Sequence, residues 1–193
     1  MYKLCKTEQS ARRQRRLEEG LLSAMKQRRY EEITISDLCD QLQIPRKSFY
    51  RYFSSKDGAL HALLDHTLLE FQQTTGIFTD RAGYDNSQHA LERYFEFWLE
   101  RRQLLDALEK SNLSGLLVQR AVNQALSEHA ISALMLPEPL RSVRSQAISF
   151  AICGLMSMVL SWHHDGCAQS PRQMAQIAAK VMSTPLIPQT DGN

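Results

Sequence analysis

One stretch of twenty residues, from Thr34 to Phe53, constrains the fold more than any other part of the sequence: it reads TISDLCDQLQIPRKSFYRYF. Its first half places four apolar residues on one helical face, at spacings of three and four: Ile35, Leu38, Cys39 and Leu42. Thr34 precedes that face and Asp37 follows three residues later, which is typical of a capping box. Gln43 and Pro45 then mark a tight turn, because proline cannot continue a helix but can begin one. We therefore predict a helix over about 35–42 and a turn after it.

The second half predicts a helix from about Pro45 to Phe53 whose two sides differ. One side is aromatic, with Phe49, Tyr52 and Phe53 at i, i+3 and i+4. The other side carries cations and a tyrosine: Arg46, Lys47, Tyr50 and Arg51. A short helix of this kind packs through its aromatic side and offers the other side to phosphates and base edges. The stretch therefore predicts a helix-turn-helix whose second helix is the recognition helix.

The charge distribution also indicates nucleic acid at the N-terminal end. Residues 1–60 hold 13 Lys and Arg against 8 Asp and Glu, whereas the remaining residues hold 10 against 13. A basic first part on a mildly acidic remainder favours a nucleic-acid-binding head, although random scatter of surface charge gives the same count. Four arginines cluster in the first turns of a helix predicted over about 9–28: Arg12, Arg13, Arg15 and Arg16. They indicate either phosphate contacts or a solvated basic face.

The remainder of the chain predicts only helices, because no run alternates polar and apolar residues as a strand does. The expected helices cover about 54–75, 87–101, 102–110, 114–134, 140–163 and 170–183. The helix over 140–163 is apolar nearly all round, so we expect other parts of a protein, rather than a membrane, to cover it on every side. The predicted class is all-α. It comprises a three-helix helix-turn-helix DNA-binding domain over 1–55, a helical ligand-binding and dimerisation domain over 56–185 and a loose tail over 186–193.

The residues from Thr34 to Lys56 resemble the DNA-binding domain of the TetR/AcrR family of transcriptional regulators. The landmarks that carry the resemblance are Thr34, Leu38, Ile44, Phe49, Tyr50, Phe53 and Lys56. The string WHHDGCAQSP, from Trp162 to Pro171, is similar to the family's junction between its last two helices. The resemblance implies a homodimer that pairs through about 140–163 and 170–183, binds double-stranded DNA at a partly palindromic operator and takes a small-molecule effector in its body.

The resemblance also implies roles for individual residues. Thr34 would hold a phosphate near the start of the first helix of the motif, and Lys56 would contact the DNA backbone from the start of the next long helix. The remaining DNA contacts would be major-groove contacts by Arg46, Lys47 and Arg51, and phosphate contacts by Tyr50 and Tyr52. For Lys47 a phosphate is the alternative target.

Two positions depart from the family pattern. Gln43 stands where the family usually has Gly, at a turn position that favours positive φ, and a non-Gly residue there costs roughly 1 kcal/mol. Pro45 stands where the family usually has Ser or Thr. Proline keeps the helix start but loses a hydroxyl that could cap the helix and touch DNA, and it leaves a ring that can pack on a thymine methyl.

Aromatic side chains in the body are candidates for lining the effector pocket. The candidates are Phe71, Tyr94, Phe97, Trp98, Phe150 and Met156. For each of them, an ordinary place in the core is the alternative. The helical interior of the body carries few charges, so we expect an effector that is at least partly apolar.

The sequence offers no pattern for catalysis, a cofactor or a metal. The cysteines (Cys5, Cys39, Cys153 and Cys167) lack paired spacing and predict a reducing, cytoplasmic location without disulfides. His163, His164 and Cys167 resemble a metal cluster, but adjacent histidines on a helix point to different sides, so we favour a helix-end cation role for the histidines. A nucleophile elbow and a glycine-rich phosphate loop are both lacking, so the chain is not expected to be an enzyme.

The functional hypothesis is a dimeric DNA-binding transcriptional repressor that a small-molecule effector releases from its operator. The alternative is a helix-turn-helix co-regulator that acts mainly through protein–protein contacts, without an effector. A gel-shift measurement at moderate salt with a selected DNA pool distinguishes the two hypotheses.

Overall fold

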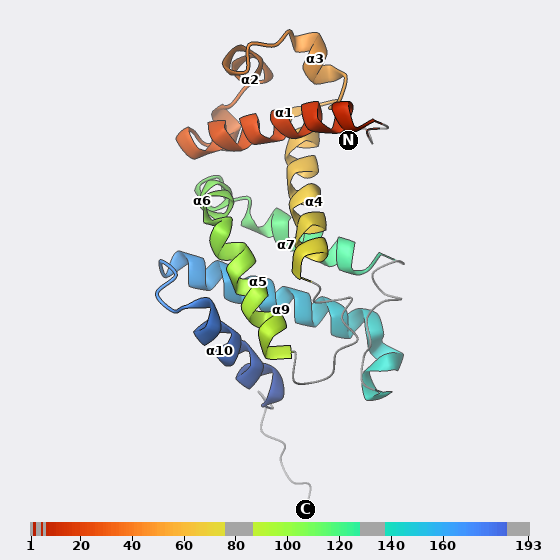
Figure 1. Ribbon diagram of the computed structural model, residues 1–193, viewed down its shortest axis with the longest axis vertical. Coiled ribbons are helices and arrows are strands. Elements are labelled where there is room, and N and C mark those ends of the chain that lie inside the picture. The colour runs from red at the N-terminus through yellow and green to blue at the C-terminus, as the bar shows by residue number, and fades with distance from the viewer. Residues whose placement is uncertain (1, 3–4, 6, 76–86, 128–137, 185–193) are drawn as a thin grey trace, which may run out of the picture. The chain divides into compact units, whose positions relative to one another are not determined.

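The computed structural model describes the chain except residues 1, 3–4, 6, 76–86, 128–137 and 185–193 (Figure 1). The described residues confirm the all-α class, since their one β feature is an isolated bridge between Tyr2 and Phe53. The helices are α1 (Glu8–Gln27), η1 (Tyr30–Glu32), α2 (Ile35–Gln41), α3 (Arg46–Tyr50), α4 (Lys56–Thr75), α5 (Ser87–Glu100), α6 (Arg102–Lys110), α7 (Ser114–Ala125), η3 (Glu138–Val143), α9 (Arg144–His164) and α10 (Pro171–Ser183). The predicted tail over 186–193 and the predicted helix beyond residue 127 lie outside the described residues.

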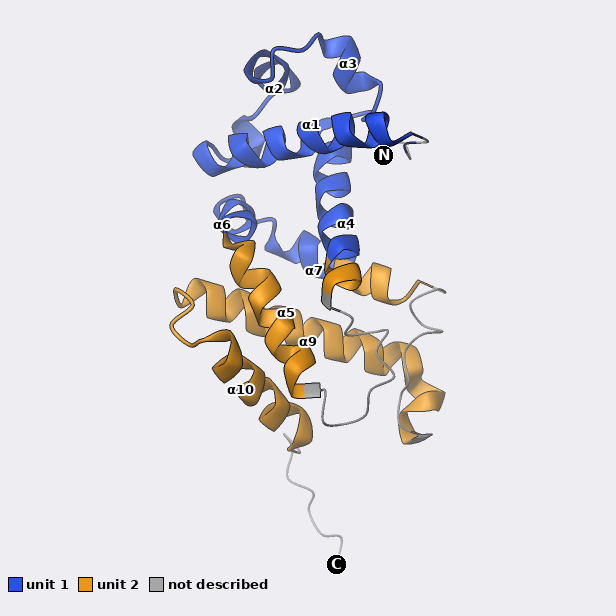
Figure 2. Cartoon of the chain, in the orientation of Figure 1, with its two compact units in different colours: residues 1–70, 103–120 blue, residues 71–102, 121–193 orange. Residues whose placement is uncertain are grey.

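The chain forms two compact units (Figure 2). Unit 1 comprises Met1–Glu70 and Gln103–Arg120, and unit 2 comprises Phe71–Arg102 and Ala121–Asn193. This division differs from the predicted boundary at residue 55, because most of α4, nearly all of α6 and the first part of α7 cluster with the N-terminal helices.

The core of unit 1 forms around the apolar face of α1. The members of that face are all buried: Leu17, Leu21, Ala24 and Met25. They share the core with Leu38 of α2, Phe49 of α3 and Leu60 and Leu64 of α4. Each large side chain that is fully buried in this way contributes about 1.5–3 kcal/mol, so the short helices α2 and α3 depend on packing rather than on their own propensity.

Two polar pairs reinforce unit 1. The carboxylate of Glu18 in α1 is 1% exposed and lies 2.9 Å from Nδ1 of His66 in α4. Asp65 of α4 forms a bidentate ion pair with Arg120 of α7 and also accepts a hydrogen bond from the Tyr2 hydroxyl at 2.8 Å. Tyr2 is therefore docked on α4.

Residues of α6 and the turn after it bond to the end of α1 and to the start of η1. The Lys110 ammonium donates to the Gln27 carbonyl at 2.9 Å, at the C-terminal end of α1, where a positive charge is favourable. The hydroxyl of the buried Ser111 accepts a hydrogen bond from the Tyr30 backbone N–H at 2.9 Å. These bonds explain why this part of α6 belongs to unit 1.

In unit 2, α5 packs against α10 and contacts α9. Phe95 of α5 meets Trp162 of α9 edge to face, with ring centroids 5.5 Å apart. Ser170 caps α10 through a capping box with Gln173, and Pro171 is the first helical residue.

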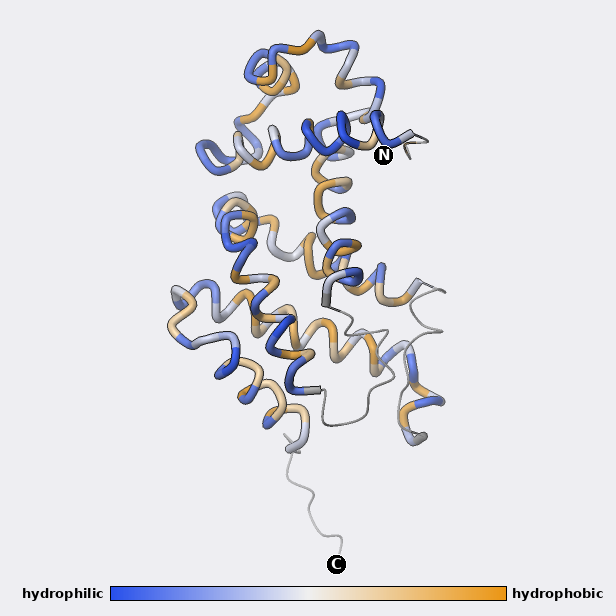
Figure 3. The backbone as a smooth tube through the Cα atoms, viewed as in Figure 1, coloured by the Kyte–Doolittle hydropathy of each residue, from blue (hydrophilic) through white to orange (hydrophobic). Residues whose placement is uncertain are grey.

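The apolar helix near the C-terminus corrects one prediction. Residues 140–143 belong to the 3-10 helix η3, and α9 begins only at Arg144. Apolar residues run along α9 (Figure 3), yet Phe150 is 75% exposed in this chain, so the expectation that α9 is covered on every side is wrong for a single copy. By length and composition Pro139–His164 could cross a membrane, but core helices of soluble proteins pass the same test, so this is weak evidence.

Candidate nucleic-acid interface

The start of α2 has the predicted capping box. The Thr34 hydroxyl accepts a hydrogen bond from the Asp37 backbone N–H at 3.1 Å, and the Asp37 carboxylate accepts one from the Thr34 N–H at 2.9 Å. The bonds from Thr34 hold the pKa of Asp37 below its ordinary value. Thr34 itself is exposed at this helix start.

The turn of the helix-turn-helix is a Schellman motif. The Gln43 N–H donates to the Asp40 carbonyl at 3.1 Å, and the Ile44 N–H donates to the Cys39 carbonyl at 2.9 Å. Gln43 has a φ of 52°, which confirms the predicted positive φ. The motif satisfies two carbonyls at the end of α2 and directs the chain into α3.

The recognition helix α3 is shorter than predicted. Pro45 has a ψ of 142° and is the N-cap rather than the first helical residue. The regular helix ends at Tyr50 instead of Phe53, although the Phe53 N–H still donates to the Phe49 carbonyl at 3.1 Å. One further turn therefore continues the helix direction as far as Phe53.

The two sides of α3 differ as predicted. Phe49 and Phe53 are each 1% exposed, and their ring centroids lie 5.3 Å apart. The opposite side exposes Pro45, Arg46, Lys47, Tyr50 and Arg51. We call these five residues the outer face of α3. Arg46 also hydrogen bonds to the Ser36 hydroxyl of α2, which links the two helices of the motif.

Two predicted phosphate ligands occupy other environments. Tyr52 is 6% exposed and packs with the aromatic side of α3 rather than standing free on the outer face. The Lys56 ammonium donates to the carbonyls of Tyr30 and Ile33 at 2.6 and 2.7 Å. Burial lowers the pKa of Lys56. Lys56 therefore holds the segment before α2 against the start of α4. No local sequence pattern predicts this role, because its partners are backbone carbonyls.

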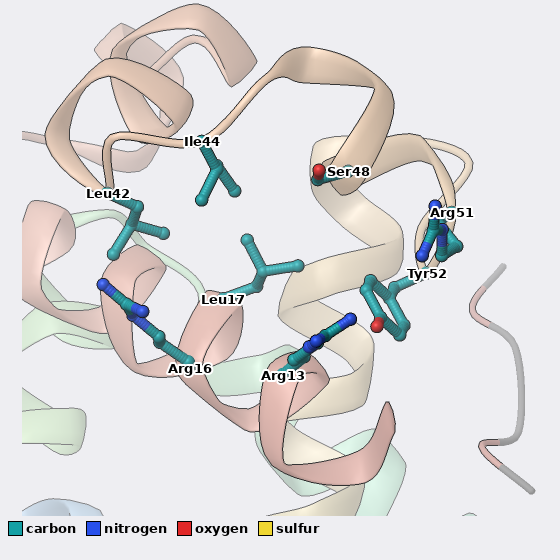
Figure 4. Close-up of a pocket in the computed structure, with 8 residues that line it drawn as sticks. All are labelled: Arg13, Arg16, Leu17, Leu42, Ile44, Ser48, Arg51 and Tyr52. Carbon is teal, nitrogen blue, oxygen red and sulfur yellow. The ribbon is translucent and has the colours of Figure 1, made fainter. Parts of the chain in front are cut away.

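A pocket beside the recognition helix was not predicted. It has a volume of ≈ 210 Å³ and lies between α1 and the helix-turn-helix (Figure 4). Its lining residues are Arg13, Arg16, Leu17, Leu42, Ile44, Ser48, Arg51 and Tyr52. Two of the four arginines singled out in α1 thus share a pocket with Arg51.

The predicted effector residues divide into a cluster and one outlier. Phe71, Tyr94, Phe97, Trp98 and Met156 are all buried in unit 2. The Phe71 ring lies 5.5 Å from that of Tyr94 and 5.2 Å from that of Phe97, and the Tyr94 hydroxyl bonds to Met156 Sδ at 3.2 Å. Phe150 does not join them, because it lies exposed on α9.

The aromatic cluster contains a buried indole N–H. Trp98 is 1% exposed, and its Nε1–H lacks a hydrogen-bond partner among the described residues. Burial raises the pKa of Tyr94, and the nearby Trp98 opposes that rise, although the indole does not reach hydrogen-bond geometry.

The described residues include no group of three or more His, Cys, Asp or Glu side chains that could hold a metal ion. His163 and His164 occupy the last turn of α9, whose end is a second Schellman motif with Gly166 and Cys167 at positive φ.

Two family models cover most of the chain. The model of bacterial regulatory proteins of the tetR family matches residues 21–63, and that of a transcriptional regulator C-terminal region matches residues 85–184. No curated protein sequence matches the chain.

Solved structures share the fold. A tetR-family transcriptional regulator from Streptomyces coelicolor is 22% identical with a TM-score of 0.55, over 90% of this chain and 81% of that one. The fatty acid degradation regulator FadR from Bacillus halodurans is 12% identical with a TM-score of 0.61, over 95% and 98%. The dihydroxyacetone kinase operon activator DhaS is 13% identical with a TM-score of 0.55, over 88% and 93%. At identities of 12–22%, these similarities show the fold alone. The family follows from the two family models, which match a DNA-binding region and a C-terminal region characteristic of non-enzymatic regulators. The chain belongs to the TetR family of DNA-binding transcriptional regulators.

Proposed function

We propose that the protein is a cytoplasmic, homodimeric repressor that binds a partly palindromic operator and leaves it when a small molecule binds in unit 2. The observation that carries the proposal is the outer face of α3. It presents Arg46, Lys47, Tyr50 and Arg51 to solvent, while Phe49 fixes the other side of the same helix in the core.

The outer face suits the major groove. Arginine can bond with two N–H groups to O6 and N7 of guanine, which is worth about 1–3 kcal/mol of discrimination. Arg46 and Arg51 are proposed base readers, with Lys47 and Tyr50 at bases or phosphates. Thr34, at the exposed N-terminus of α2, is a proposed phosphate contact, because helix N-termini attract anions.

Exposed apolar side chains on α9 and α10 support a homodimer. Phe150 is 75% exposed, and Met182 of α10 is 62% exposed. Ile177 and Val181 expose about two-fifths of their surface on the same helix as Met182. A second copy would cover such side chains and place two recognition helices about 34–36 Å apart, or a multiple of that, on one face of DNA.

The aromatic cluster of unit 2 supports a mostly apolar effector. The unpartnered Trp98 N–H favours a ligand that carries at least one hydrogen-bond acceptor. The helix α4 contributes Lys56 to the head and Phe71 to this cluster. A ligand that displaces Phe71 would act on α4, and it shifts DNA affinity only by the difference between its affinities for the two states.

The test is selection of operator sequences from a random DNA pool, followed by a ligand screen for release. The proposal expects a motif with two related half-sites, whose spacing is fixed by the dimer. Binding without sequence preference would instead favour the co-regulator alternative. Since DhaS is an operon activator, a reporter gene downstream of the selected operator decides between repression and activation in this chain.

A further inference from the structure

The pocket between α1 and the helix-turn-helix combines charge with apolar surface in a way that the proposed DNA contacts do not require. Its residues come from α1, from the turn after α2 and from α3 with the turn that follows it (Figure 4). All of these residues belong to unit 1.

The charge in the pocket is uniformly positive. Arg13, Arg16 and Arg51 line it, and none of the three pairs with a carboxylate within the described part of the chain. By contrast, Arg12 pairs with Glu8 at 2.6 Å and Arg28 with Asp37 at 3.4 Å. Three cations on one cavity without a counter-charge favour an anionic occupant.

The other lining residues add apolar surface and hydroxyl groups. Leu17 is buried, and Leu42 and Ile44 are half-buried, so they form an apolar patch between the arginines. In Figure 4 the Arg16 side chain extends toward Leu42 and the Arg13 side chain toward Tyr52. Ser48 and Tyr52 supply the hydroxyl groups. A DNA phosphate would use the arginines but would leave the apolar patch uncovered.

The size of the cavity limits the ligand. Its ≈ 210 Å³ lies below the roughly 300–1,000 Å³ that drug-sized ligands occupy. A cavity of this size therefore suits a small molecule, and its lining favours one that joins an anionic group to a short apolar part.

We propose that this pocket binds a small amphipathic carboxylate. Its carboxylate is attracted by the positive charge of Arg13, Arg16 and Arg51, and its apolar part covers Leu17, Leu42 and Ile44. Because Arg51 also belongs to the outer face of α3, a ligand bound to Arg51 would prevent this residue from contacting DNA. This consequence rests on the proposed DNA binding, whereas the binding site itself does not.

The site is tested by methyl NMR on the full-length protein without DNA. The probes are hexanoate, benzoate and octanoate, with hexan-1-ol and inorganic phosphate as partial mimics that each lack one half of the chemistry. We expect saturable shifts of the Leu17, Leu42 and Ile44 methyl groups with at least one carboxylate, and at least tenfold weaker binding of both mimics. A ligand of this size should bind with a dissociation constant below roughly 10 mM. If none of the three carboxylates gives a saturable shift up to that concentration, the site does not exist.

Matched arginine variants assign the binding to this pocket. Arg13→Gln combined with Arg16→Gln should raise the dissociation constant of the bound carboxylate about tenfold or more, because each removes a charged hydrogen-bond donor. Arg15→Gln, on the same helix but outside the lining, should leave it unchanged within twofold. Equal effects of the two changes would overturn the assignment, and thermal unfolding shows whether each variant is folded.

A second arm measures release from DNA by fluorescence anisotropy. The carboxylate should weaken operator binding of the wild type, and this weakening should be lost in the Arg13→Gln, Arg16→Gln variant. Release that persists in that variant would place the effective site elsewhere and contradict competition at the head. A failure of DNA binding itself would appear without any carboxylate, so it is distinguishable from a failure of the pocket.

Discussion

Lys56 and Tyr30 form a close pair at the base of the helix-turn-helix: the ammonium donates to the Tyr30 carbonyl at 2.6 Å and lies 4.1 Å from the centroid of the Tyr30 ring. The Tyr30 hydroxyl in turn donates to Asp57, beside Lys56 in α4, at 2.6 Å. These bonds hold Tyr30, in the segment before α2, against the start of α4. Lys56, which the family pattern assigns to a DNA contact, thus also holds the segment before the helix-turn-helix against α4.

Replacing Lys56 with Met should therefore lower stability as well as DNA affinity. A hydrogen bond from a charged donor contributes about 1.5–3 kcal/mol, and the partial exposure of Lys56 places its loss near the lower value. Urea unfolding measures this change. Lys47→Met is the control, because Lys47 is exposed on the outer face and should lower DNA affinity without altering the unfolding midpoint. Equal stability of both variants would contradict the structural role of Lys56.

The turn residue Gln43 predicts a stabilising substitution. With φ at 52°, Gln43→Gly relieves backbone strain but also gives the unfolded chain more freedom, so we expect a gain of at most about 1 kcal/mol. Gln41→Gly, at an exposed helical position in α2, should instead cost about 0.5–1 kcal/mol. Chemical unfolding of the pair gives the comparison. A loss of similar size at both positions would mean that Gln43 is not strained.

The two neighbouring tyrosines should differ in their effect on DNA. Tyr50 is 51% exposed on the outer face, whereas Tyr52 is 6% exposed. Tyr50→Phe should weaken DNA binding about three- to tenfold through the loss of one hydrogen bond, while Tyr52→Phe should change it less than twofold. Anisotropy titrations with one operator fragment separate them, and the reverse order would restore Tyr52 as a phosphate ligand.

Tyr2 predicts a dependence of stability on alkaline pH. Burial, followed by the hydrogen bond to Asp65, raises the pKa of Tyr2 to about 12. The folded state therefore holds this proton more tightly than the unfolded state, whose phenol titrates near about 10. The contribution of Tyr2 is complete below about pH 10 and is lost as the pH rises through about 12. Thermal unfolding between these values should fall less steeply for Tyr2→Phe than for the wild type, and parallel curves would refute the assignment.

Local patterns in the sequence predicted the elements that depend on local chemistry. The capping box at Thr34, the positive φ of Gln43 and the two sides of α3 all follow from residues within one or two turns of each other. Such features are readable because their partners are close in sequence.

Features that join distant segments were missed. Glu18 meets His66, and Ser111 meets Tyr30, only after the chain has folded. The pocket likewise needs α1 beside the turn: a methyl group in place of the Gly20 hydrogen would lie 2.7 Å from Leu42 Cδ1. Phe150 was misplaced for a related reason, because hydrophobicity indicates a buried residue but does not identify whether the same chain or a second copy buries it.

Parallel operator selections with the wild type and Arg51→Ala show whether the outer face of α3 reads DNA bases. Arg15→Ala is the control, because Arg15 is an exposed cation of α1 outside the outer face. We expect a two-half-site motif for the wild type, the same motif for Arg15→Ala, and loss of preference at one symmetric pair of positions for Arg51→Ala, at a cost of about 1–3 kcal/mol. An unchanged motif for Arg51→Ala would contradict base reading by this residue, and the absence of any motif for the wild type would contradict base reading by the outer face of α3.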